Sequence, residues 1–207
     1  MKIVLTIFIF LMPFFVDAQD QVKCKEIGLS TRSLLFRDDF GFIYKTGSES
    51  ALWRVNTLFA FGNHDEEASD IFEKVSMDNQ ITLNLGREYR KNFEEDFEFR
   101  YGFDLSFSFS HYLFTMDNPS TNEIEKSDKT ISYGPGVNAV IGLNYKIKNK
   151  IIIGAEILPS FHYYTGKTES IDSNVNNGQV VISDLTGFSY GINNASVLFS
   201  ISYRIKK

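Results

Sequence analysis

The stretch from Phe97 to Ser110 alternates strictly between two kinds of side chain. Its seven odd positions carry large apolar or aromatic residues, whereas its even positions carry charged, small or hydroxyl residues. Because successive side chains of a β-strand point to opposite faces, the pattern predicts one long strand with an aromatic face and a polar face. Such a face is more apolar than a small core requires. The direction in which it points therefore decides what kind of protein the chain forms.

Residues 1–18 have the features of a secretory signal peptide. Lys2 precedes an apolar run from Ile3 to Val16, and the small residue Ala18 marks the expected cleavage position. The run is shorter than the roughly 20 residues that a spanning helix needs, which disfavours an uncleaved membrane anchor. Residues 19–207 are then expected to form one exported domain.

Composition excludes several other classes of protein. Cys24 is the only cysteine, so no intrachain disulfide can form, and its separation from the apolar run disfavours a lipid anchor. The formal net charge is −5 at pH 7, and no basic patch points to nucleic acid. We expect no cofactor.

Most of the chain after Glu26 is predicted to form eight antiparallel strands. Three polar stretches are expected to be long loops, at residues 63–77, 117–129 and 166–184, and the other connections are short. After a tight first connection, every long loop then falls on one end of the sheet, and both chain ends fall on the other. The predicted strands are Ile27 to Leu34, Phe40 to Tyr44, Ala51 to Gly62, Ile81 to Glu88, Phe97 to Ser110, Tyr133 to Lys146, Ile151 to Tyr164 and Gly187 to Ile205, the last with a bulge at Asn193-Asn194.

The two faces of these strands favour an apolar exterior. The interior of an eight-stranded barrel has room for little more than its own side chains, so inward phenylalanines from several strands would overfill it. The opposite face, dominated by Gly, Ser and Asn, carries fewer charges than a water-exposed surface. We therefore predict an all-β fold, an eight-stranded antiparallel up-and-down transmembrane β-barrel, and keep a secreted soluble lipocalin-like ligand-binding barrel as an alternative.

Tyrosine and tryptophan positions agree with a bilayer around the strands. They gather near the two ends of the predicted strands, where amphipathic aromatic rings meet the membrane interfaces. The expected lower set is Tyr44, Trp53, Tyr89, Tyr101, Tyr145 and Tyr203, and the expected upper set is Tyr112, Tyr133, Tyr163 and Tyr190.

With these features the chain resembles the small outer-membrane β-barrel proteins of Gram-negative bacteria, the group that includes OmpX and the OmpA barrel domain. The resemblance rests on the signal peptide, the arm Asp39-Phe40-Gly41-Phe42-Ile43-Tyr44-Lys45, the alternating strands and the terminal Ser202-Tyr203-Arg204-Ile205. It implies an outer-membrane location, contact with lipopolysaccharide, and insertion by the barrel-assembly machinery. Members usually end in an aromatic residue, where this chain has Ile205-Lys206-Lys207.

Charged residues on the polar face are expected to meet inside the barrel. Unpaired buried charges are costly, so a network of ion pairs is the natural filling, and eight strands leave little space for a conducting path. The expected network comprises Arg32, Arg54, Glu88, Glu98, Arg100, Asp104, Glu156 and Arg204.

An enzyme acting on lipid A or phospholipid is the other alternative. It would need a serine nucleophile beside a histidine base and an acidic residue. Ser160, His162 and Glu156 share one face of a strand, but residues two apart in a strand lie about 7 Å from each other, so we expect no catalytic site. His64, with the acidic residues 65–67, is expected to be a solvated loop rather than a metal site. The sequence names no ligand for the loops.

Overall fold

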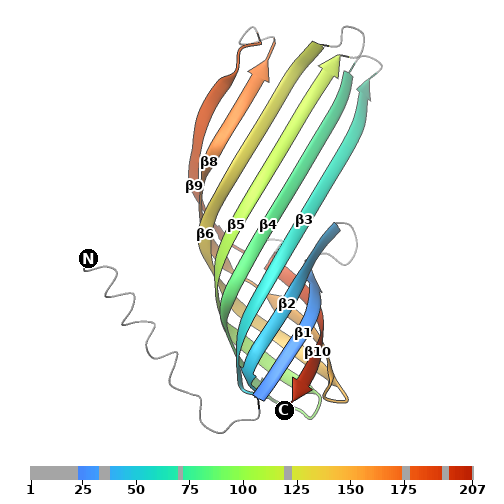
Figure 1. The fold of residues 1–207 in the computed structure, drawn as a ribbon, viewed down its shortest axis with the longest axis vertical. Coiled ribbons are helices and arrows are strands. Elements are labelled where there is room, and N and C mark those ends of the chain that lie inside the picture. Colours follow the sequence, from blue (N-terminus) through green and yellow to red (C-terminus); the bar gives the residue numbers. More distant parts are fainter. Residues whose placement is uncertain are drawn as a thin grey trace, which may run out of the picture.

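The computed structural model describes residues 23–32, 38–69, 72–118, 123–173, 178–192 and 196–206. The predicted signal peptide lies outside these ranges. No helix in the described part has the length and apolar character to cross a membrane. Ten antiparallel strands form one sheet (Figure 1): β1 (Lys23–Thr31), β2 (Asp38–Ser48), β3 (Ala51–Ser69), β4 (Phe72–Asn92), β5 (Phe97–Asn118), β6 (Glu123–Ile147), β7 (Ile151–Ile157), β8 (Ser160–Asp172), β9 (Val181–Gly191) and β10 (Val197–Lys206).

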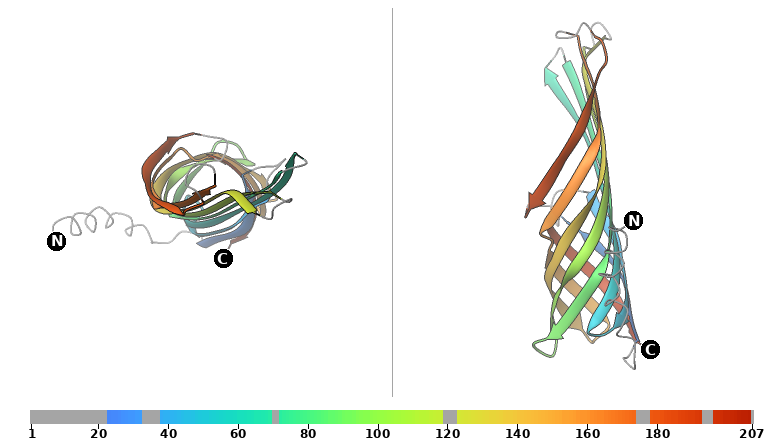
Figure 2. Two further views of the ribbon diagram at one scale, coloured as in Figure 1. Left: turned by 90° about the horizontal axis from the view of Figure 1, so that it is seen from above. Right: turned by 90° about the vertical axis from the view of Figure 1, so that its left-hand side faces the viewer.

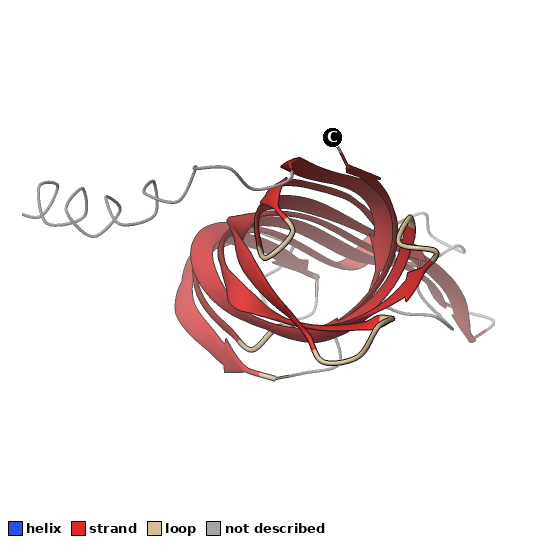
Figure 3. Cartoon of the chain, turned by 90° about the horizontal axis from the view of Figure 1, so that it is seen from below, coloured by secondary structure: helices blue, strands red, loops and turns tan. Residues whose placement is uncertain are grey.

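The sheet closes on itself through eight of its strands. Strands follow one another in the order β1 to β7, and β10 completes the ring by pairing with both β7 and β1. The first and last strands meet in a regular antiparallel register, in which Cys24 is opposite Lys206 and Leu29 is opposite Ile201. A view from below shows the closed ring (Figure 3). Closure pairs the backbone of the two strands that an open sheet would leave as edges.

One end of the ring carries only short turns. Residues 49–50, 93–96 and 148–150 connect consecutive strands there, and the start of β1 and the end of β10 lie at the same end. At the third turn, Lys148 and Asn149 both have positive φ angles of 50° and 55°. Two such residues give the mirror-image turn whose twist matches that of the flanking strands. We call this end the short-turn end.

At the other end the sheet continues far beyond the ring. The pairing of β3 with β4 continues to Glu67 opposite Glu73, and that of β5 with β6 to Asn118 opposite Glu123. These regions, together with β8 and β9, form a tall open sheet that keeps the curvature of the ring (Figures 1 and 2). We call it the hairpin sheet. The prediction of long loops at 63–77, 117–129 and 166–184 was wrong for most of those residues, which lie in strands, whereas residues 173 and 178–180 lie between β8 and β9. Polar residues on both arms of a hairpin can pair their backbones as apolar ones do.

Two predicted strands appear as two strands each. The predicted strand from Ile151 to Tyr164 is divided into β7 and β8 by Leu158 and Pro159, since proline has no N–H to donate to the ladder. Strand β7 pairs with β10 in the ring, whereas β8 pairs with β9 in the hairpin sheet. The predicted strand from Gly187 to Ile205 is similarly divided into β9 and β10. The bulge predicted at Asn193-Asn194 falls outside the described residues.

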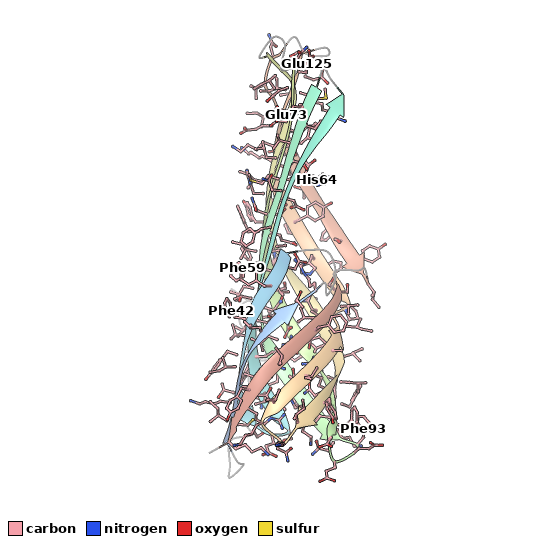
Figure 4. All side chains as sticks on the ribbon, turned by 90° about the vertical axis from the view of Figure 1, so that its right-hand side faces the viewer. Phe42, Phe59, His64, Glu73, Phe93 and Glu125 are labelled. Carbon is pink, nitrogen blue, oxygen red and sulfur yellow. The ribbon has the colours of Figure 1, made fainter. Side chains whose placement is uncertain are left out.

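Side chains separate into an apolar exterior and a charged interior. On β5, Leu105 is 55% exposed whereas the adjacent Asp104 is 0% exposed, and the same alternation runs along the strands of the ring. Phe42 and Phe59 project from the outer surface in Figure 4, and Phe93 lies at the short-turn end. The phenylalanines therefore do not meet around a central axis, as a soluble barrel with an apolar core would require.

Closure of the ring can be tested by cross-linking outward residues of β1 and β10. In a Cys24→Ala background, we expect Leu29→Cys and Ile201→Cys to form a disulfide on mild oxidation, because directly paired Cα atoms lie about 4.5–5.5 Å apart. Leu29→Cys with Ile153→Cys is the matched control, since those residues lie two strand spacings apart, about 9–10 Å. Equal cross-linking of both pairs on non-reducing gels would contradict the closure.

Candidate functional site

Charged side chains fill the interior of the ring near the short-turn end. Arg90 donates two hydrogen bonds of 2.6 Å to the carboxylate of Glu26, and one of 2.6 Å to Glu88. Arg204 donates to Glu26 at 2.6 Å and to both oxygens of Glu98 at 2.8 and 2.9 Å. Strands β1, β4, β5 and β10 are thus joined through their side chains as well as their backbones.

Arg54 is the centre of the second half of this cluster. Its guanidinium donates to both oxygens of Glu156 at 2.8 and 2.9 Å and to Glu88 at 3.2 Å, and its Nε lies 3.3 Å from Asp104. Lys45 donates to Glu88 at 2.7 Å. All five side chains are at least 98% buried. Paired charged hydrogen bonds of this kind are the strong ones, and they fix the directions of the Arg54 and Glu156 side chains.

Glycine makes room for one cation of the cluster. Arg100 approaches Glu156 at 3.3 Å and Glu88 at 3.8 Å. A Cβ atom added to Gly142 would lie 2.8 Å from the Nε of Arg100, and one added to Gly154 would lie 2.7 Å from its Nη2. A side chain at either position would collide with the guanidinium, and also with the backbone oxygen of Ala155 at Gly142 or the hydroxyl of Ser200 at Gly154.

Seven of the eight residues expected in the network belong to it. The eighth, Arg32, lies apart, 3.3 Å from Asp39, and donates to the side chain of Gln80. The sequence analysis did not include four members, although each occupies an inward-facing position of its strand. They are Glu26, Lys45, Arg90 and Lys146. We call the whole set the ion-pair cluster: Glu26, Lys45, Arg54, Glu88, Arg90, Glu98, Arg100, Asp104, Lys146, Glu156 and Arg204.

A small apolar cluster also lies inside the ring, which the predicted polar interior did not include. Leu58, Val140, Leu158 and Leu198 are buried together. Leu58 and Leu158 also line a cavity of about 480 Å³. The interior is thus filled by charges near the short-turn end and is hollow farther along.

The wall of this cavity is made mostly of hydroxyl and amide side chains. Among the described lining residues are seven serines, one threonine, two asparagines and one glutamine. His162 Nε2 lies 3.1 Å from the Oδ1 of Asn138, and Asn138 donates through its Nδ2 to Asn84 at 3.1 Å. These contacts connect β8, β6 and β4 across the interior.

Ser160, His162 and Glu156, the residues weighed above as a catalytic site, do not contact one another in the described structure but face different partners. Glu156 is held by Arg54 and Arg100 in the ion-pair cluster, whereas His162 contacts Asn138. Ser160 and His162 both line the cavity, but no carboxylate is among the described lining residues. The acidic residue that would orient a histidine base is therefore committed elsewhere.

Most of the predicted interfacial aromatics lie on the outer face. Tyr89 stacks on Tyr101 with ring centroids 5.7 Å apart, and the guanidinium of Arg87 lies 5.0 Å from the Trp53 ring. Tyr112 differs, since strand alternation places it with Ser110 on the inner face. The remaining members on the outer face are Tyr44, Tyr133, Tyr145, Tyr163, Tyr190 and Tyr203.

His64 lies in β3 rather than in a loop, opposite Ser76 of β4. It is labelled in Figure 4 on the hairpin sheet. The side chains of residues 65–67 lie outside the described part. Within that part, no group of three or more His, Cys, Asp or Glu residues is arranged to hold a metal ion.

Comparison with known proteins gives matches in structure only. No protein-family model matches the sequence. A search of curated proteins also finds no match. A major outer membrane protein from Thermus thermophilus superposes with a TM-score of 0.50 and 13% identity, covering 89% of this chain and 99% of that one. The chain has the fold of an outer-membrane β-barrel.

Two further solved barrels match over most of their length. Ail, the attachment invasion locus protein of Yersinia pestis, is 15% identical with a TM-score of 0.34, covering 90% of this chain and 100% of that chain. Neisserial surface protein A is 12% identical with a TM-score of 0.35, covering 90% of this chain and 96% of its own. The superposition on the Thermus thermophilus protein confirms, at the level of fold, the resemblance to outer-membrane β-barrels that the sequence indicated.

The stability of this β-barrel should depend on Arg54. We expect Arg54→Met to lower the free energy of unfolding by about 3–5 kcal/mol, because Glu88, Asp104 and Glu156 stay buried without their shared cation. Urea unfolding of protein folded into lipid vesicles measures the change. Lys126→Met is the control, since the half-exposed Lys126 pair with Asp128 is worth about 0–1 kcal/mol. A loss no larger than that of the control would contradict a supporting role for the cluster.

Proposed function

We propose that the protein is an integral outer-membrane protein, an eight-stranded up-and-down barrel whose strands span the bilayer. The exported domain begins after residue 18. Its eight spanning segments are the strands of the closed ring, with β8 and β9 extending the last two beyond the membrane. The short-turn end faces the periplasm and the hairpin sheet faces the outside, as in outer-membrane barrels generally.

One observation carries this proposal: the ring is apolar outside and charged inside. Leu105, Phe107 and Ile141 are 48–55% exposed, while Arg54, Glu88 and Asp104 are 0% exposed. Hydrocarbon around the ring removes the cost of that exposed apolar surface. Closure pairs β1 with β10, so that neither strand is left as an open edge, as a structure in lipid requires.

The interior supports a structural role for the barrel itself. The ion-pair cluster occupies the space that a conducting path would need, so we propose a plugged lumen. We also propose that the protein is not an enzyme, because Glu156 is engaged by two arginines and does not orient His162. No observation favours lipid A or phospholipid chemistry.

The hairpin sheet is the part that we propose to act at the cell surface. It rises beyond the ring, and Glu73 and Glu125 lie on it in Figure 4. Its lower border would lie against lipopolysaccharide of the outer leaflet. Insertion would depend on the barrel-assembly machinery.

Fractionation of Gram-negative cells that produce the whole chain tests the location. We expect the protein in the outer-membrane fraction, with faster gel migration before heating than after. Leu105→Arg should reduce the folded, membrane-bound fraction, since an arginine near the bilayer midplane costs about 2–4 kcal/mol.

Glu73→Arg is the control, because Glu73 is exposed on the hairpin sheet. In a soluble protein both arginines would lie in water and have little effect. A buffer-soluble protein without a heat shift, or one unaffected by Leu105→Arg, would contradict the proposal.

A further inference from the structure

We infer that the cavity beyond the ion-pair cluster is a binding site for a neutral saccharide. Its volume of about 480 Å³ falls within the range of about 300–1,000 Å³ that is typical of ligand pockets. The cavity is bordered by strands of both the ring and the hairpin sheet, with Leu58 and Leu158 at one side. The inference deepens the proposed surface role, because the hairpin sheet supplies part of the wall.

Charge narrows the class of ligand. No carboxylate is present among the described lining residues, so a cation would find no counter-charge there. Arg32 is the one cation of that described lining, and its charge is already balanced by Asp39 at 3.3 Å, while Gln80 accepts its hydrogen bonds. Burying a charge without a free partner is costly, so the site fits an uncharged ligand.

Hydroxyl and amide side chains outnumber the aliphatic ones in the wall, which favours a polyhydroxylated ligand over a purely apolar one. Serine and threonine hydroxyls both donate and accept, and asparagine and glutamine do so through separate atoms. Aliphatic lining side chains are limited to Leu58, Leu158 and Leu185 within the described part. A lipid chain would leave most of these polar groups unpaired, whereas each hydroxyl of a sugar can pair with one. Tyr133, Tyr163 and Tyr164 also line the cavity, and aromatic surface of this kind suits the C–H face of a pyranose.

The wall also has spare hydrogen-bonding capacity at a fixed place. Ser106 lines the cavity, is 5% exposed, and its hydroxyl has no hydrogen-bond partner among the residues that the structure describes. Buried polar groups are nearly always paired, so a ligand hydroxyl that reaches this almost inaccessible oxygen gains a hydrogen bond. Neighbouring groups are held in place by their own contacts, Thr82 with Ser108 at 3.2 Å and Asn138 with Asn84 at 3.1 Å. The site is therefore partly organised before a ligand arrives.

Hydroxyl groups continue along the inner face of the hairpin sheet. Thr130 and Thr168 are hydrogen-bonded at 3.0 Å across β6 and β8, and Ser170 donates to Asp128 at 2.6 Å. Strands β6 and β8 extend from the ring toward the far end of the hairpin sheet (Figure 2). A saccharide longer than one ring can follow it outward.

Nuclear magnetic resonance titration of the purified whole chain tests the inference. The protein is folded in dodecylphosphocholine, whose headgroup contains no sugar, and titrated separately with glucose, N-acetylglucosamine, lactose and glucose 6-phosphate. We expect saturable shifts with at least one of the three neutral sugars, confined to amides of the cavity and the inner hairpin face. Ser110→Phe, which fills the cavity, should weaken that binding at least tenfold. His111→Phe places the same ring on the opposite face of β5 and should leave it unchanged.

Three results would overturn the inference. They are no saturation by any neutral sugar, shifts that map to the outer face, and tighter binding of glucose 6-phosphate than of glucose. The mapping uses the unmodified protein, so it decides the matter even if Ser110→Phe does not fold. The titration does not depend on where the protein is located in the cell. A negative result would therefore contradict saccharide binding but not the proposed outer-membrane location, which the fractionation experiment tests separately.

Discussion

Burial of eleven charged side chains in the ion-pair cluster is the constraint on which the rest of the structure depends. Each charge taken out of water costs several kcal/mol unless it is paired with good geometry. The cluster sets six cations against five carboxylates, and arginines bind Glu26, Glu98 and Glu156 through paired hydrogen bonds. Asp104 is held by an ion-pair contact with Arg54 at 3.3 Å without a hydrogen bond among the described residues. Such a set exists only when all the contributing strands are in place.

The cluster and the closed ring therefore require each other. Arg54 and Glu156 lie 102 residues apart in sequence, and Arg204 and Glu26 lie 178 apart, yet both pairs contact directly once β10 pairs with β1 and β7. Strand alternation then leaves only the outer face for the aromatic residues. A single arrangement thus brings the charges together inside the ring and leaves the apolar side chains outside, which suits apolar surroundings of the ring.

Alternation of residue types made the orientation of the ring predictable. The pattern of Phe97–Ser110 is strict, and the structure places its aromatic residues outside. Other features were hidden for physical reasons. Residues 63–77 carry no alternating apolar face, so their pairing in a hairpin could not be recognised. Lys45 was not included in the expected network, although it lies two residues from Ile43 on the same strand and therefore also points inward. The contacts within the cluster depend on strand register around the ring, which local sequence does not encode.

The most direct test of this account uses tryptophan fluorescence, because Trp53 is the only tryptophan of the chain. The protein is folded into vesicles whose lipids carry bromine at different depths, and a Trp53→Phe, Leu105→Trp double variant serves as a second probe. If the outer face contacts acyl chains, bromine near the headgroups should quench Trp53 most, and bromine deep in the chains should quench the tryptophan of the variant most. Absence of quenching at both positions would contradict the account.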